Sequence, residues 1–123
     1  MFQMSVELRL QLCMTPDSQC VYITDIVRAC VKKFTLTGDL LCKSTMPLSA
    51  PHGAALACDG GVIVCDFGKY RVVVLSPDLS SILRTFSVSS PSRKFSGQCT
   101  EVCVAGERLY VLEQKHQLVH VLQ

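Results

Sequence analysis

The sequence has no tryptophan, and only 7% of its 123 residues are aromatic. No stretch approaches the roughly eighteen consecutive apolar residues that a membrane-spanning helix needs. Charged residues make up 18% of the chain, and the net charge of +2 is too small to indicate a nucleic-acid partner by itself. No Ser/His/Asp or Cys/His arrangement for nucleophilic catalysis is evident. The length fits one domain at most.

The eight cysteines include no Cys-x-x-Cys pair, which argues against zinc-finger and thioredoxin-type sites. A secreted disulfide scaffold is one interpretation of so many cysteines. Most of them, however, lie in or beside apolar strand patterns, as small hydrophobic residues do: Cys13, Cys20, Cys30, Cys58, Cys65 and Cys103. Residues 1–14 also lack the basic start and continuous apolar run of a signal peptide. We therefore expect a cytoplasmic protein with buried, reduced thiols and no membrane contact.

Short strands joined by tight turns run through the middle of the chain, over 54–57, 62–65, 71–75 and 82–86. Gly60, after Asp59, supplies the positive φ that a two-residue hairpin turn needs. A second turn covers residues 67–70. At the start of the chain, apolar and polar residues alternate over 6–12, which predicts a strand with one wet face.

The strand pattern repeats. Residues 20–25 match residues 61–66 with an offset of 41, and residues 109–113 match 62–66 with an offset of 47. Repeats of about 40–50 residues with several short strands are typical of propeller blades. Two strands, 62–65 and 72–75, are apolar on both faces, as expected for stacked sheets. A β-sandwich is the alternative, but it does not explain the repeat.

The sequence therefore predicts an all-β fold, a partial β-propeller of about three four-stranded blades with the last incomplete. Blade 1 covers about 6–46, blade 2 about 51–87, and blade 3 about 98–123 without its outer strand. Together they form a single array over residues 1–123.

The middle repeat resembles the NHL repeat family, whose pattern it matches at Pro51, Gly53, Asp59, Gly60, Asp66, Arg71 and Val72. The first repeat keeps Asp25 but has Cys30 in place of the arginine. The third repeat has Glu113 for the aspartate and Leu118 for the arginine. No Trp-Asp ending is present, which disfavours a WD40 propeller.

The resemblance implies a non-catalytic scaffold for protein–protein interaction rather than an enzyme. Some family members carry a RING domain and act as ubiquitin ligases, so a role as an adaptor in ubiquitination is one implication; this chain has no RING cysteine spacing. RNA binding through a basic propeller face, known for other members, is the alternative.

Three blades are fewer than the four to eight of a closed propeller, so apolar blade faces should stay uncovered. We expect a protein partner to cover them, either a second copy or another NHL protein. A truncated product that folds poorly is the competing interpretation.

A candidate binding site is a basic rim formed by turns on one propeller face: Arg28, Lys69, Arg93, Lys94, Lys115 and His116. Clustered cations attract phosphate or acidic peptides, although exposed turns favour charged residues in any protein. The recurring Asp25, Asp66 and Glu113 are assigned a structural role, with Asp66 reaching Arg71 across a hairpin. We assign no metal site to His52, His116 and His120, and we expect no cofactor.

Overall fold

The computed structural model describes residues 11–87, 99–113 and 117–122 of the chain. Eleven strands in these residues form three antiparallel sheets, each wound in sequence order. The strands of the first sheet are β1 (Gln11–Met14), β2 (Cys20–Asp25), β3 (Cys30–Thr35) and β4 (Leu40–Lys43). The second sheet holds β5 (Pro51–Leu56), β6 (Val62–Asp66), β7 (Arg71–Leu75) and β8 (Ile82–Ser87), and the third holds β9 (Glu101–Ala105), β10 (Arg108–Glu113) and β11 (Leu118–Leu122).

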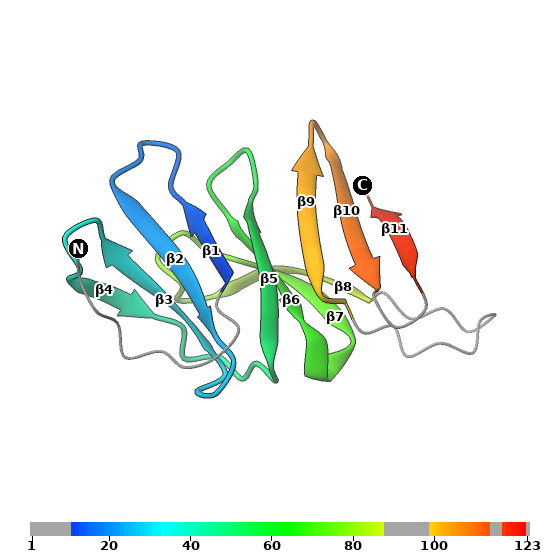
Figure 1. Ribbon diagram of the computed structural model, residues 1–123, viewed down its shortest axis with the longest axis horizontal. Coiled ribbons are helices and arrows are strands. Elements are labelled where there is room, and N and C mark those ends of the chain that lie inside the picture. The colour runs from blue at the N-terminus through cyan, green and yellow to red at the C-terminus, as the bar shows by residue number, and fades with distance from the viewer. Residues whose placement is uncertain (1–10, 88–98, 114–116, 123) are drawn as a thin grey trace.

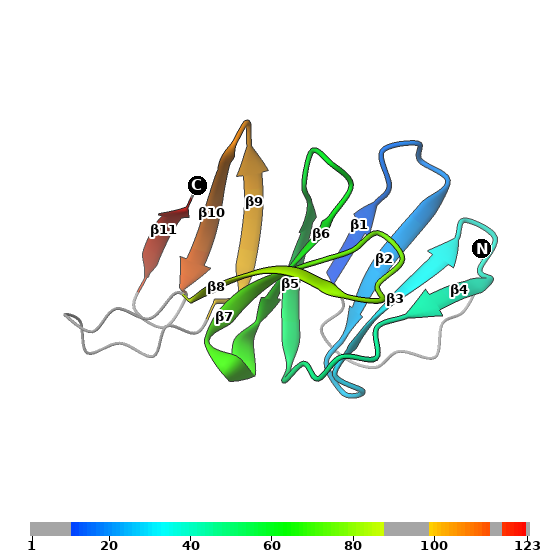
Figure 2. The same cartoon turned by 180° about the vertical axis from the view of Figure 1, so that it is seen from behind.

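The three sheets stand side by side like the blades of an open fan, with blade 2 in the middle (Figures 1 and 2). The first strand of blade 2, β5, contacts the first strands of both neighbours, β1 and β9. The turns between first and second strands lie on one side of the array, and the turns that follow β2 and β6 lie on the other (Figure 1). The predicted fold class, a partial propeller of about three blades, is confirmed.

The hydrophobic core consists mainly of two clusters, one on each side of blade 2. Toward blade 1, Val64 and Val73 pack with Tyr22 and Val31. Toward blade 3, the cluster contains Ile63, Cys65, Val72, Val74, Cys99, Val102, Leu109 and Val111. The strands β6 and β7 are therefore buried on both faces, which explains why their sequences do not alternate.

Polar contacts add to the packing between blades 1 and 2. The Tyr22 hydroxyl donates a hydrogen bond to the Pro77 carbonyl oxygen at 2.7 Å, and the Thr24 hydroxyl donates to the His52 carbonyl oxygen at 2.8 Å. Both hydrogen bonds join β2 to blade 2, so directional contacts add to the apolar packing between the two blades.

The hairpin between β5 and β6 is present, but its turn is longer than the two residues expected from the sequence. The Ala57 amide donates to the Gly61 carbonyl oxygen at 2.8 Å and closes a loop of three residues, within which the Gly60 amide donates to the Ala57 carbonyl oxygen at 3.0 Å. Gly60 has φ +92°, and Asp59 accepts a hydrogen bond from the Gly61 amide at 3.0 Å. The glycine thus serves a three-residue turn, a common alternative with a residue in the left-handed region.

Strand limits differ from the expected ones mainly at the inner strand of blade 2. The strand β5 begins at Pro51, which pairs with Asp66, and ends at Leu56. The register shifts between Pro51 and Ala54, and within this shift Gly53 donates its amide to the Thr100 carbonyl oxygen of blade 3, at 2.9 Å. Of the strand expected over 6–12, only residues 11 and 12 are described, and they belong to β1.

Candidate binding surfaces

Asp66 is completely buried at the end of β6 and joins three segments of the chain. Its carboxylate accepts hydrogen bonds from Arg71 Nε at 2.9 Å and from the Ser49 amide at 2.7 Å. The Arg71 guanidinium also donates to the Pro47 carbonyl oxygen at 3.0 Å. The carboxylate and its cation therefore fix the linker that leads from blade 1 into blade 2.

The other two blades keep the buried carboxylate but place its basic partner at a different position. In blade 1, Asp25 binds Lys32 Nζ at 3.3 Å and Arg28 Nη1 at 3.2 Å. In blade 3, Glu113 Oε2 lies 3.2 Å from His120 Nε2. Lys32 and His120 each stand two residues after the position that Arg71 occupies in blade 2, and they share the carboxylate's face of the sheet.

Ionisation of Asp25 is favoured by this arrangement. Burial works against the charged form, but the Arg28 amide, the Lys32 ammonium and the Arg28 guanidinium together outweigh it. The pKa of Asp25 is consequently held below its ordinary value, which is the behaviour of a carboxylate that braces a turn.

Two members of the expected basic rim lie in described residues, and both are engaged with the protein. Arg28 binds Asp25, and Lys69 Nζ donates to the Pro47 carbonyl oxygen at 3.2 Å. Their turns lie on the same side of the array (Figure 1). The remaining four, Arg93, Lys94, Lys115 and His116, lie outside the described residues. The rim as a binding surface stays a prediction.

Sequence reasoning missed Lys32 as a partner of Asp25 and His120 as a partner of Glu113. His120 is four-fifths buried beside Glu113. The signal that would have found both is the strand period of two, which keeps residues i and i+2 on one face. Among the described residues there is no group of three or more His, Cys, Asp or Glu side chains placed to hold a metal.

The outward face of blade 3 is apolar and exposed. Val119 is 62% exposed and Val121 is 54% exposed, and Tyr110 and Leu112 stand beside them on the same face. With the offset of 47 between the repeats, Val119, Val121, Tyr110 and Leu112 align in sequence with Val72, Val74, Ile63 and Cys65 of blade 2, in that order. Those four are buried against blade 3. The same positions are thus covered in one blade and uncovered in the next.

The outward face of blade 1 differs. Leu12 and Met14 are exposed there, whereas Val21, Ile23 and Phe34 form a small buried cluster. The expected pair of uncovered apolar faces is therefore clearest on blade 3.

The cysteine side chains are not all buried, although the sequence predicted that most of them would be. All eight are free, but Cys58 and Cys103 are exposed, whereas Cys30, Cys65 and Cys99 are buried. Their positions in strand patterns did not distinguish inward from outward side chains. A hydrogen bond with the Cys99 thiol, together with burial, raises the pKa of Cys65.

This distribution predicts the order of thiol labelling. With a disulfide reagent at pH 8, Cys58 and Cys103 should react first and Cys65 last, because the thiolate is the reactive form and Cys65 is both shielded and protonated. Mass spectrometry of labelled peptides measures the order. Denatured protein should yield eight reactive thiols. Labelling of Cys65 as fast as that of Cys58 would contradict the packing between blades 2 and 3.

The NHL repeat family matches residues 48–75, from the linker before β5 to the end of β7. Among curated protein sequences, none matched this chain. A chain of the nidogen/laminin complex has a similar structure, with a TM-score of 0.75 and 17% identity over 98% of this chain and 45% of that one. Virginiamycin B lyase from Staphylococcus aureus has a TM-score of 0.71 and 14% identity over 99% of this chain and 44% of the lyase chain. Luciferin-regenerating enzyme has a TM-score of 0.71 and 20% identity over 94% of this chain and 40% of the enzyme chain.

At these identities the similarity concerns the fold alone, and the chain spans less than half the length of each structure. The architecture is that of a β-propeller. The family match adds an NHL repeat at residues 48–75 to this architecture. The neighbours include enzymes as well as a chain of a protein complex, so the fold does not assign catalysis. None of the helices in the described part of the chain has the length and apolar character of a membrane span.

Proposed function

We propose that this protein is a non-catalytic protein-binding scaffold, and that the outward face of blade 3 docks on a propeller blade of a partner. The exposure of Val119 and Val121, where blade 2 buries Val72 and Val74, is the observation that carries the proposal. Exposed apolar patches of this kind mark association surfaces.

The chemistry of the partner follows from the interfaces inside the chain. Blade 2 covers its corresponding face with Val102, Leu109 and Val111 of blade 3, a row of aliphatic side chains from two strands. A blade with the same kind of row would match the outward face of blade 3. The partner we propose is a second copy of this chain, and the alternative is another NHL-repeat protein.

The link to ubiquitination rests on the family resemblance and belongs to the same proposal, as an adaptor that brings a bound protein to a ligase. RNA binding is less favoured, because Arg28 and Lys69 are bound to protein oxygen atoms. We propose a cytoplasmic location from the eight free cysteines.

Self-association should depend on the outward face of blade 3. The wild-type chain is expected to have an apparent mass of about twice that of the monomer. The double variant Val119→Glu/Val121→Glu should have the monomer mass, because its two introduced charges would lose their hydration in the apolar contact. Sedimentation equilibrium measures both masses.

Leu36→Glu is the matched control, because Leu36 is exposed in the turn between β3 and β4 and lies away from this face. It should leave the mass unchanged. A wild-type chain that is monomeric with a sharp melting transition would contradict self-association. Capture of the chain by RNA that nuclease abolishes, with no capture by protein, would favour the alternative function.

A further inference from the structure

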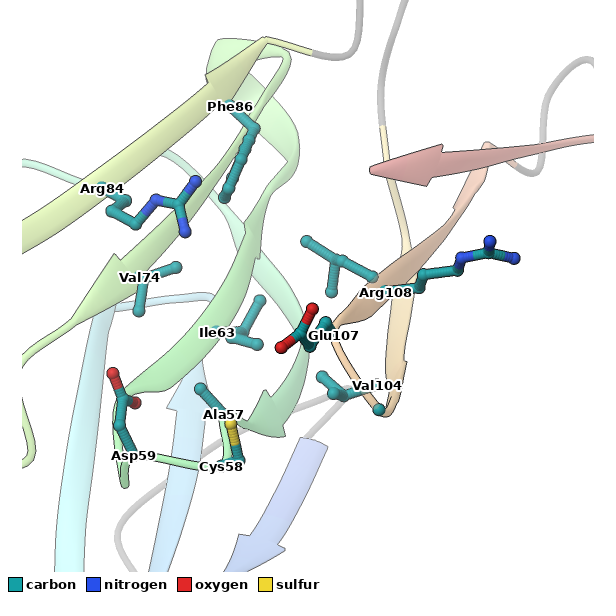
Figure 3. Close-up of a pocket in the computed structure, with 12 residues that line it drawn as sticks. Ala57, Cys58, Asp59, Ile63, Val74, Arg84, Phe86, Val104, Glu107 and Arg108 are labelled. Atoms are coloured by element: carbon teal, nitrogen blue, oxygen red, sulfur yellow. The ribbon is translucent and has the colours of Figure 1, made fainter. Parts of the chain in front are cut away.

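A cavity of about 420 Å³ lies between blades 2 and 3, on the side of the array that carries the turns between first and second strands (Figure 3). Its floor is apolar, with Ile63 and Val74 from blade 2 and Val104 and Leu109 from blade 3. The volume falls within the range of about 300–1,000 Å³ that small-molecule sites span. None of its lining residues lies in the turns that carry Arg28 and Lys69 or on the outward face of blade 3.

Two charged side chains of opposite sign flank this floor. Arg84, on β8, lies over the Phe86 ring with its guanidinium carbon 4.7 Å from the ring centre. The attraction between the guanidinium and the ring does not use the N–H groups, which can still donate to a ligand. Glu107, in the turn between β9 and β10, points its carboxylate into the cavity from the opposite wall (Figure 3).

The other charged residues at the cavity are less available to a ligand. Asp59 accepts a hydrogen bond from the Gly61 amide within its own turn, and Arg108 points away from the cavity (Figure 3). Within the described residues, neither Arg84 nor Glu107 forms an ion pair with a neighbour. One cation and one anion thus face each other across an apolar floor.

We propose that this cavity binds a zwitterionic ligand with an apolar body, of the amino-acid or short-peptide type. Arg84 donates hydrogen bonds to the ligand's carboxylate, and Glu107 accepts them from its ammonium group. The apolar side chains of the ligand lie on the floor. An anion alone would meet the repulsion of Glu107 and a cation alone that of Arg84, so the site selects a molecule that carries both charges.

Three related probes test the two charges separately by isothermal titration calorimetry. Leucyl-phenylalanine has both charges, its N-acetyl derivative keeps only the carboxylate, and its C-terminal amide keeps only the ammonium group. The free dipeptide should bind about tenfold more tightly than either blocked form, the effect of one lost charge-assisted hydrogen bond.

Two variants then assign each preference to a residue. With Arg84→Gln, the dipeptide and its amide should bind equally, because the partner of the carboxylate is gone. With Glu107→Gln, the dipeptide and its N-acetyl form should bind equally. Arg108→Gln, which removes the cation that points away, is the control and should change neither preference. Comparing the affinity of free phenylalanine with that of the dipeptide shows whether the cavity prefers an amino acid or a peptide.

The charge-exchanged variant Arg84→Glu/Glu107→Arg should still prefer the free dipeptide, bound in the reverse orientation. The proposal is overturned if the blocked peptides bind the wild type as tightly as the free dipeptide. It is also overturned if Arg84→Gln keeps the full preference, or if no saturable binding is seen up to about 10 mM, the weak end of specific affinities.

Discussion

Replacement of Asp66 by alanine is expected to lower the free energy of unfolding by about 3 kcal/mol, because it removes one partner from a buried ion pair. The completely buried carboxylate accepts from Arg71 Nε and from the Ser49 amide. Without it, the guanidinium keeps only the Pro47 carbonyl oxygen at this end, and the Ser49 amide loses its acceptor. Urea unfolding followed by circular dichroism measures the loss.

Asp17→Ala is the control for this prediction. Asp17 is also a turn carboxylate that accepts a backbone hydrogen bond, from the Gln19 amide at 3.0 Å, but it is exposed. Its replacement should leave the unfolding curve almost unchanged, since water takes over from a lost exposed contact. If the two variants lost the same stability, the buried pair would not be what fixes the linker between the first two blades.

Gly53→Ala is expected to loosen the contact between blades 2 and 3 and to lower stability by about 3 kcal/mol. A Cβ atom at this position would lie 2.7 Å from the Thr100 carbonyl oxygen and 2.8 Å from Glu101 Cα. Both are backbone atoms of blade 3, so neither can rotate away. The hydrogen bond from the Gly53 amide to Thr100 would lengthen as the inner strands separate.

Hydrogen exchange gives this variant a local readout. Amides of β9 and β10 should exchange faster than in the wild type, while those of β2 and β3 should be unchanged because they lie beyond blade 2. Gly106→Ala is the matched control, since a Cβ atom added there would meet no described atom within 4 Å and only the φ of +61° opposes the change. It should cost about 1 kcal/mol. Equal exchange of β9 in both variants would show that the inner strands do not need the glycine.

The blade architecture could be predicted because it is local and repeated. Apolar runs bounded by turn residues gave β6 and β7 nearly residue for residue, and the offset between repeats placed their counterparts in the other blades. The sequence did not predict the start of β5, where Pro51 pairs with Asp66 across a register shift and Gly53 contacts Thr100, forty-seven residues further along the chain. Such contacts leave no periodic signal in the strand itself.

The candidate sites were much harder to predict. The cavity depends on how far blades 2 and 3 stand apart at Arg84 and Glu107, which is a property of packed sheets and not of any motif. Thiol exposure was equally hidden, because Cys65 and Cys103 both lie in apolar strands and differ only in the face on which they stand. The partners of Asp25 and Glu113 were missed because a residue-by-residue comparison looked for a cation only at the position of Arg71.

The shifted basic residues of blades 1 and 3 have a consequence for how such repeats can change during evolution. Residues two apart on a strand share a face, so a lysine or histidine at the later position can hold the same carboxylate before an arginine is lost. The exchange would then pass through a chain that has both basic residues and never leaves the carboxylate unpaired. A repeat that changed in this way would keep its architecture without matching the family's sequence pattern, which in this chain is matched over residues 48–75.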